Sequence, residues 1–398
     1  MSKTIYGSIL LMSAAHAVTD LPQGALLVAL PFLKAKFALT YTQTSVIILV
    51  QSLTSSISQP IFGYFSDKKS RPWLMPAGCI LSGVGFLLSL LVPSYELMLV
   101  FTFLSGLGVA IFHPEGAKTA HQLSGNSQGK GVSLFVVGGT AGMALGSLLL
   151  AALLVNGPGW QLFLYVVPSL AIALPVSRLT KKIPLRQGNQ NIRTGFSRQF
   201  FSGSLLALLG AILIRAMVSS GLSTFIPLYF ISFLGGDPLL SSTILTIYLA
   251  SGAMGTLTGG ALSDRFGSKQ VMLWSIAPAA LVIYAFQSAS GAMVYLLLAI
   301  ASMLLAAAHS SSLVLAQRMM PGNVGMASGL SLGFSFGVGA LGVLALGRVA
   351  DLWSLPVVFD ILALLPLVGL VCTFFVRDPA TEALPEATRV FASETEKR

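Results

Sequence analysis

Twelve long apolar runs dominate the sequence, and each is long enough to cross a lipid bilayer. A membrane helix needs about 20 predominantly apolar residues to span the hydrocarbon core. Only 9% of the residues are charged, against roughly 25% in a soluble domain. That leaves too little charge to cover a water-facing surface, so the sequence predicts an all-α membrane protein with twelve transmembrane helices. The runs lie near residues 5–33, 42–65, 73–92, 96–121, 128–155, 160–179, 202–233, 239–263, 270–289, 292–317, 323–347 and 353–376.

A short basic loop occurs twice, at equivalent places in the two halves of the chain. The first copy reads GYFSDKKSRPW from Gly63, and the second reads GALSDRFGSKQ from Gly260. In each copy the glycine precedes an aspartate, Asp67 or Asp264, by four positions, and basic residues follow. A repeat at half the chain length indicates two similar membrane halves. We therefore expect an N-terminal six-helix half over 1–179, a cytoplasmic linker over 180–201, a C-terminal six-helix half over 202–376 and a cytoplasmic tail over 377–398.

The basic residues predict the orientation of the chain. If the N-terminus is cytoplasmic, 19 of the 23 lysines and arginines fall on the cytoplasmic side and only three, Lys34, Lys36 and Arg348, fall outside; the remaining one, Arg215, lies inside a run. This asymmetry follows the positive-inside rule and places both termini in the cytoplasm. The net charge of +10 does not indicate nucleic-acid binding, because the basic residues sit in short loops between apolar runs.

Glycines recur at close helical spacing in the fifth and eleventh runs. Small residues three or four positions apart let two membrane helices approach closely. We expect tight helix packing at most of these positions, and a sliding surface during transport is compatible with it. The glycines are Gly138, Gly139, Gly142 and Gly146 in the fifth run, and Gly329, Gly333, Gly337, Gly339 and Gly342 in the eleventh.

Ionisable residues inside an apolar run are costly and usually face a cavity or one another. The first run carries His16 and Asp20, which are four positions apart and therefore share a helix face. The seventh run carries Arg215, almost the symmetry mate of Asp20. One hypothesis is a permanent ion pair between Asp20 and Arg215. The other is that Asp20 exchanges a proton while Arg215 binds an anionic substrate or tunes the carboxyl group.

The fourth run carries His113 and Glu115 on either side of Pro114, which can break the helix. Both side chain types are readily tuned to exchange protons near neutral pH. They are second candidates for proton coupling, and the alternative is a structural hydrogen-bonded cluster. His309, which follows three alanines, is either a cavity residue that contacts substrate or a packing residue.

Several kinds of chemistry have no signature in the sequence. There is no ATP-binding phosphate loop and no nucleophile elbow, and no set of cysteines, histidines and carboxylates has metal-ligand spacing. Cys79 and Cys372 lie in apolar runs far apart and indicate no disulfide. The sequence therefore predicts no enzyme, no metal and no cofactor, and the proton gradient is the expected energy source.

The two basic loops resemble the signature loop of major facilitator superfamily transporters, which follows the second helix and, in weaker form, the eighth. Within that superfamily the chain is similar to the fosmidomycin resistance protein group of drug exporters. The matching features are His16 and Asp20, the Phe-His-Pro-Glu at 112–115 and the stretch from Gly322. The resemblance implies the major facilitator fold, and it implies that Gly63, Asp67, Arg71, Gly260 and Asp264 form a conformational latch.

The resemblance also implies proton-driven efflux of a small drug-like or anionic compound, such as a phosphonate antibiotic, from a bacterial plasma membrane. We expect a monomer in the inner membrane, with protons coupled through Asp20, His113 or Glu115. Substrate would contact His16, Asp20, Arg215 and His309. Exporters of the superfamily end a motif in the fifth helix with Gly-Pro, whereas this chain has Gly146-Ser147. A proton-coupled uptake symporter for an organic anion is therefore the alternative. A non-transporting receptor is disfavoured, because no loop is large enough to form a signalling domain.

Overall fold

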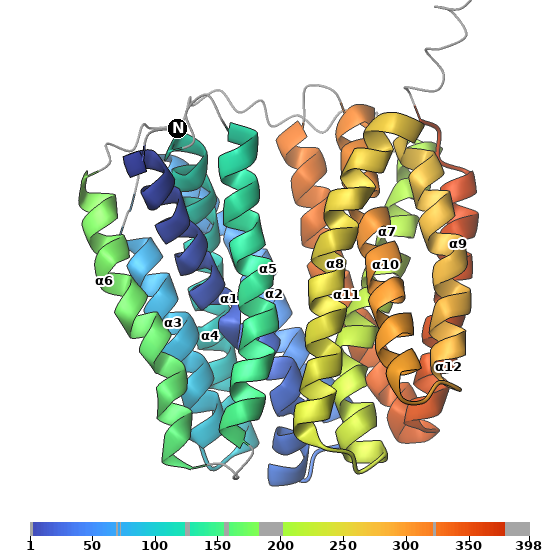
Figure 1. Cartoon of the computed structure of the whole chain (residues 1–398), viewed down its shortest axis with the longest axis horizontal. Helices are drawn as coiled ribbons and strands as arrows, with labels where there is room; N and C mark the ends of the chain where they lie inside the picture. Colours follow the sequence, from blue (N-terminus) through green and yellow to red (C-terminus); the bar gives the residue numbers. More distant parts are fainter. Residues whose placement is uncertain are drawn as a thin grey trace, which may run out of the picture. The chain divides into compact units, whose positions relative to one another are not determined.

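The computed structural model describes residues 3–68, 71, 73–123, 128–154, 159–182, 202–320 and 324–378, and within these residues the chain is helical (Figure 1). Long apolar stretches form helices because a helix satisfies every backbone polar group within its own segment. Twelve α-helices are found in the described ranges, together with a 3-10 segment, η2, and a π segment, η4. In order they are α1 (Lys3–Lys36), α2 (Tyr41–Lys68), α3 (Leu74–Leu91), α4 (Tyr95–Leu123), α5 (Gln128–Leu154), η2 (Trp160–Val166), α6 (Val167–Lys182), α7 (Gly203–Pro227), η4 (Leu228–Phe233), α8 (Pro238–Phe266), α9 (Ser268–Phe286), α10 (Ala292–Met319), α11 (Val324–Leu352) and α12 (Leu355–Phe374).

The twelve helices coincide with the twelve apolar runs, which confirms the all-α prediction. In the part of the chain that the structure describes, nine helices meet a strict criterion of length and hydropathy for a membrane span. Two runs are less regular than a single α-helix. The sixth begins with η2, and the seventh passes into η4 directly after Pro227. Proline lacks an N–H, so the regular hydrogen-bond ladder is interrupted at that position.

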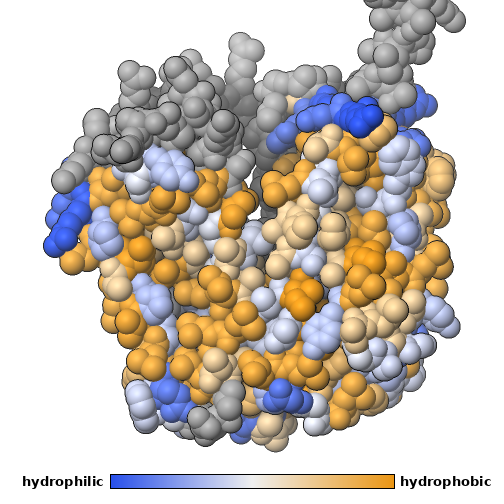
Figure 2. Space-filling model, in the orientation of Figure 1, coloured by the Kyte–Doolittle hydropathy of each residue, from blue (hydrophilic) through white to orange (hydrophobic). Residues whose placement is uncertain are grey.

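The helices bear large apolar side chains on their outer faces. Leu257, Leu281 and Leu364 are more than 60% exposed, which would be unfavourable in water. Figure 2 shows a face that is largely hydrophobic over the helices, with hydrophilic residues gathered near the helix ends. This distribution is that of a protein whose helices contact lipid.

The described chain divides into two compact units. Of the described residues, the first unit comprises those within 1–193, 220–250 and 340–358, and the second comprises those within 194–219, 251–339 and 359–378. The first unit therefore holds α1 to α6 together with parts of α7, α8, α11 and α12. The expected division at a linker over 180–201 stays a prediction, because residues 183–201 and the tail from 379 lie outside the described residues.

Glycines of α5 bring its backbone directly against α1. A Cβ placed on Gly138, Gly142 or Gly146 would lie 2.2, 2.1 or 2.0 Å from a carbonyl oxygen of α1. Real Cβ atoms do not approach oxygen so closely, so only glycine permits this packing. The prediction of close helix packing is confirmed for the fifth run. The corresponding side-chain environments at Gly329 and Gly333 of α11 lie outside the described residues.

The prolines of α1 and α4 do not end their helices. Pro22 and Pro31 lie inside α1, and Pro114 lies inside α4. The expectation that Pro114 breaks the helix is wrong, because α4 continues to Leu123. Membrane helices tolerate an internal proline because neighbouring side chains and helices compensate for the missing hydrogen bond.

Candidate functional site

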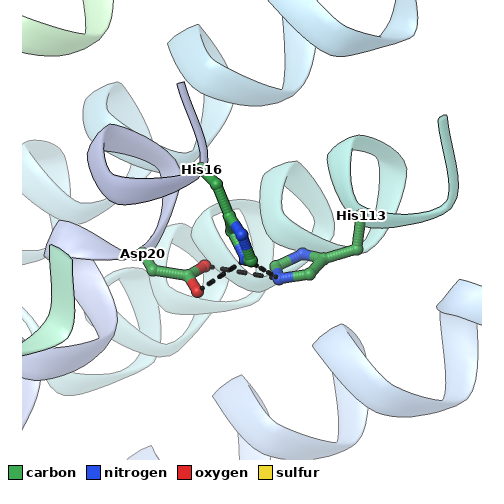
Figure 3. A group of neighbouring side chains, drawn as sticks. All are labelled: His16, Asp20 and His113. Carbon is green, nitrogen blue, oxygen red and sulfur yellow. Dashed lines mark hydrogen bonds and ion pairs between the residues drawn. The ribbon is translucent and has the colours of Figure 1, made fainter. Parts of the chain in front are cut away.

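Three ionisable side chains meet between α1 and α4 in the first unit. His16 and Asp20 come from α1 and His113 comes from α4, and Figure 3 shows all three pointing toward one another. The Nε2 atoms of the two histidines are 3.0 Å apart. The Asp20 carboxylate places Oδ2 3.2 Å from Nε2 of His16 and Oδ1 3.5 Å from Nε2 of His113. The expected shared face of His16 and Asp20 is thus observed, and tertiary packing adds His113 to it.

The outer nitrogens of both rings bind backbone carbonyl groups. Nδ1 of His16 lies 2.7 Å from the carbonyl oxygen of Phe135, and Nδ1 of His113 lies 2.8 Å from that of Val109. A carbonyl oxygen only accepts hydrogen bonds, so each Nδ1 must carry the proton. In a neutral histidine the remaining nitrogen, Nε2, is then an acceptor.

With the proton on Nδ1 of each ring, the two Nε2 atoms and the Asp20 carboxylate are all hydrogen-bond acceptors, and they face one another. Two neutral rings would direct two Nε2 lone pairs at each other and at the Asp20 carboxylate, with no proton between them. His16 and Asp20 are buried, so water does not screen this repulsion well. One additional proton turns one ring into an imidazolium ion, which donates to the other ring or to Asp20. The arrangement is therefore that of a site that holds a cation.

Neighbouring residues complete the pocket around the cluster. Gln23 donates from Nε2 to Oδ1 of Asp20 at 2.7 Å. The Phe135 ring stacks on the His16 ring with centroids 4.2 Å apart. A Cβ on Gly139 would come within 2.5 Å of Nε2 of His16 and 2.8 Å of Oδ2 of Asp20. Sequence reasoning did not assign Gln23, Phe135 or Gly139 to the site. Gln23 alone carried a usable signal, since it lies three positions after Asp20 on the same face.

The three side chains of the cluster are also of the types that bind metal ions, which their spacing in the sequence did not indicate. The ligand-capable atoms of His16, Asp20 and His113 all lie within 4.8 Å of one another. The sequence shows no metal-ligand spacing because His113 is 93 positions beyond Asp20, and only the packing of α4 against α1 brings it near.

Glu115, the other acidic candidate, lies outside this cluster. Its side chain is fully buried, and its Oε1 accepts the backbone N–H of Arg71 at 3.1 Å. Glu115 therefore contacts the first basic loop. His113 and Glu115, two positions apart on α4, point to different partners, as neighbours at this spacing do on a helix.

Arg215 and His309 lie in the second unit. The Arg215 side chain is buried and donates from Nη2 to Oγ of Ser335 at 3.1 Å. Its charge is close enough to act on the His309 imidazole. A buried guanidinium near a histidine forms a basic environment suited to an anion. The roles proposed for Arg215 and His309 in binding substrate stay predictions.

The basic loops are described only in part. The side-chain environments of Gly63 and Asp67 lie outside the described residues. In the second copy, Asp264 is highly exposed and its Oδ1 lies 3.9 Å from Nη2 of Arg318, and Gly260 faces open space. An exposed ion pair at that distance contributes little stability, so the latch role of this loop stays a prediction.

A second polar contact within the first unit joins α11 to α2. The Asp351 carboxylate, at the end of α11, accepts the N–H groups of Tyr41 and Thr42 at 2.6 and 2.8 Å, and the Thr42 hydroxyl at 2.5 Å. Asp351 thus caps the N-terminus of α2 from a distant part of the chain. Burial raises the pKa of the Asp351 carboxyl, but the hydrogen bonds from Thr42 and Tyr41 outweigh this effect and hold the pKa below its ordinary value.

Ser147 of α5 forms a neighbouring contact with α8. Its hydroxyl oxygen lies 2.6 Å from that of Thr246, and its carbonyl accepts the hydroxyl of Ser242 at 2.8 Å. Ser147 itself is fully buried. Hydroxyl pairs of this kind hold membrane helices together without an ion pair.

Comparison with known proteins gives a consistent result over nearly the whole chain. The family described as Major Facilitator Superfamily matches residues 12–243 and 208–396. The chain is 32% identical over 383 residues to the fosmidomycin resistance protein of Escherichia coli (strain K12), covering 94% of this chain and 93% of that protein. It is 30% identical over 385 residues to the uncharacterized MFS-type transporter YfnC of Bacillus subtilis (strain 168), covering 94% of each. Among solved structures it is similar to a D-xylose-proton symporter, with a TM-score of 0.76, 15% identity and coverage of 94% and 98%.

Proposed function

The chain belongs to the Major Facilitator Superfamily, a family of membrane transporters and not of enzymes, and on that premise we propose that it exports a small anionic or drug-like compound in exchange for protons. The relative named for fosmidomycin resistance supports efflux, since a resistance protein of this family acts by removing a compound. The buried Arg215 supports an anionic substrate such as a phosphonate. The protein is proposed to lie in the bacterial inner membrane as a monomer, with both termini cytoplasmic.

The observation that supports proton coupling is that three hydrogen-bond acceptors, from His16, Asp20 and His113, lie close together. With the extra proton, the cluster is neutral overall and hydrogen-bonded. Without it, a buried carboxylate faces two acceptor nitrogens at 3.2 and 3.5 Å. Repulsion then favours separation of α4 from α1. Protonation is thereby linked to helix packing, which is what a transporter needs in order to couple a proton to a change of access.

The three side chains of the cluster differ in how exposed they are, which bears on where a proton enters. The His113 side chain is 22% exposed, whereas those of His16 and Asp20 are 8% and 7% exposed. His113 is therefore the residue proposed to exchange protons with water, and Asp20 is proposed to hold the compensating charge. Glu115 contacts the basic loop and is the second candidate for the coupling group. The basic loops, with Gly63, Asp67, Arg71, Gly260 and Asp264, are proposed as the latch between conformations.

The test uses purified protein in liposomes that enclose a pH-sensitive dye, under an imposed proton gradient. Candidate compounds are added, beginning with fosmidomycin, and proton flux that depends on the compound is recorded. Protons moving against the compound support efflux by antiport. Protons moving with the compound would instead establish an uptake symporter, which the same cluster and Arg215 could serve. No coupled flux with any compound would refute the proposal.

The assignment of the coupling site is tested with Asp20→Asn and a matched control. Asp360→Asn makes the same change on an exposed residue whose Oδ1 accepts only the Gln287 amide among the contacts described. We expect Asp20→Asn to abolish compound-driven proton flux and Asp360→Asn to retain it. Full proton-driven transport by Asp20→Asn would exclude Asp20 as the coupling group and make Glu115 the first candidate.

A further inference from the structure

The ligand atoms of the His16–Asp20–His113 cluster have the spacing of a tetrahedral metal site. Zinc binds imidazole nitrogen and carboxylate oxygen at about 2.0–2.2 Å, so neighbouring ligands in a tetrahedron lie about 3.3 Å apart. The Nε2 atoms of the two histidines are 3.0 Å apart, Nε2 of His16 is 3.2 Å from Oδ2 of Asp20, and Nε2 of His113 is 3.5 Å from Oδ1 of Asp20. Each imidazole nitrogen thus lies near the tetrahedral spacing from the other nitrogen and from one oxygen of the carboxylate. With one ligand atom taken from each residue, all three atoms lie within 4.8 Å of one another.

The surroundings of the cluster orient these atoms as metal ligands require. A metal-binding histidine usually donates its other ring N–H to a carbonyl or carboxylate, which fixes the ring and its tautomer. Both histidines do so here, His16 to the Phe135 carbonyl and His113 to the Val109 carbonyl. Gln23 in turn donates to the Asp20 carboxylate at 2.7 Å. The two Nε2 lone pairs and the carboxylate are thereby directed at one place.

Gly139 places no side chain against the cluster, and one of the three ligands is partly exposed. Gly139 of α5 presents no side chain where a Cβ would come within 2.5 Å of Nε2 of His16. The ring of Phe135 covers the His16 face, and His113 is partly exposed. A bound ion would therefore have three protein ligands and one remaining position on the open side, which is the arrangement of zinc sites that exchange a ligand.

We propose that His16, Asp20 and His113 form a binding site for one transition-metal ion of the Zn²⁺ or Co²⁺ type. Two imidazole nitrogens with one carboxylate favour these ions over Mg²⁺ and Ca²⁺, which take oxygen ligands. The binding inference rests on the contacts alone. Its consequence rests on the proposed function: an ion shared by α1 and α4 holds these helices together and inhibits transport.

Binding is tested on the full chain, purified in detergent without a histidine tag and treated with a chelator. Zn²⁺ is added at micromolar concentration, and the bound metal is counted after equilibrium dialysis. We expect one Zn²⁺ per chain, with loss of that ion in His16→Ala and in His113→Ala. His309→Ala, which removes another of the chain's four histidines, is the matched control and should still bind one ion.

The visible absorption spectrum of bound Co²⁺ gives a second test of the site, and a change in folding would not produce the same spectrum. Tetrahedral Co²⁺ has an intense visible absorption, whereas hydrated Co²⁺ absorbs weakly, so the spectrum reports the ligand geometry. Gln23→Ala leaves all three ligands in place and removes only the hydrogen bond to Asp20. We expect this variant to show the same spectrum with an affinity about 10-fold weaker, the usual cost of losing such a partner.

Two outcomes would overturn the inference. One is the absence of Zn²⁺ binding to the wild-type chain at micromolar metal. The other is equal binding by wild type, His16→Ala and His113→Ala, which would place the ion elsewhere. Transport measured with chelator present separates this inference from the proposed function. Coupled flux without metal binding refutes only the metal site, and metal binding without any coupled flux refutes only the transport proposal.

Discussion

Substituting Asp351 by asparagine tests whether the contact between α11 and α2 controls access from the outer side. In the observed structure the Asp351 carboxylate accepts hydrogen bonds from Tyr41 and Thr42 at the first turn of α2. With both termini proposed to be cytoplasmic, this contact lies on the outer side, and we expect alternating access to break it when the protein opens outward. Weakening the contact should therefore raise the population of the outward-open state.

The size of the effect follows from the bonds that are lost. Asparagine keeps one acceptor oxygen and replaces the other with an NH₂ group, which cannot accept from the N–H groups of α2. Loss of one hydrogen bond costs about 0.5–1.5 kcal/mol, and loss of a negative charge at a helix N-terminus costs about 0.3–1 kcal/mol. Because Asp351 is partly exposed, the charge contributes at the lower end of that range. A total of about 1–2 kcal/mol corresponds to a shift of about 5–30-fold in the equilibrium.

Labelling of a buried cysteine measures this population. Cys79 and Cys372 are replaced by alanine, and Ser147, which is fully buried where α5 meets α8, is replaced by cysteine as the reporter. A membrane-impermeant maleimide is applied from outside the cell. When opening is fast relative to labelling, the labelling rate is proportional to the open population, so Asp351→Asn should be labelled about 5–30-fold faster.

Asp237→Asn is the matched control for this experiment. Asp237 accepts the N–H of Leu240 at 3.0 Å and so caps α8 from the position directly before that helix. This variant also replaces an aspartate by asparagine, but it leaves the contact between α11 and α2 intact. Its labelling rate should therefore stay within about twofold of that of the protein without the substitution. Equal labelling rates in Asp351→Asn and its parent, with both proteins folded, would refute the assigned role of the contact.

Three further predictions follow from other features of the structure. Gly142→Ala places a Cβ 2.1 Å from the Ala17 carbonyl oxygen and should destabilise the protein by about 1–3 kcal/mol in thermal unfolding. The control Gly7→Ala, whose Cβ meets nothing within 4 Å, should not destabilise it, and equal melting temperatures of the two variants would contradict close α1–α5 packing. The pKa of Asp351 is lowered, so its contact is stabilised by the ionised form above the ordinary carboxyl pKa and is lost only as pH falls through the lowered value. Because maleimide reacts with the thiolate, the labelling rate of the cysteine at 147 is divided by that of the unfolded protein at the same pH, and this ratio should be constant between about pH 6 and pH 8 and rise only in acid. Arg215→Gln should weaken binding of a phosphonate by about 10–100-fold in a direct binding assay and leave a cationic compound unaffected, and equal loss for both would indicate a structural role.

The candidate site was only partly accessible to sequence reasoning. The spacing of His16 and Asp20 was sufficient to place them on one helix face, since that relation is local. The tautomers of His16 and His113, by contrast, depend on carbonyl groups that the fold places beside them. The role of Gly139 likewise depends on which helix α5 contacts. None of these relations leaves a periodic pattern in the sequence.

The sequence by itself determined the twelve helices, their approximate ends and the membrane environment, because helix formation in lipid depends on the length and polarity of a contiguous segment. It also predicted that the glycines of the fifth run allow close packing. Only the tertiary structure decided which side chains of different helices meet. His113 and Asp20 are distant in sequence, as are Asp351 and Tyr41, and their contacts arise because packing of whole helix faces brings single atoms together.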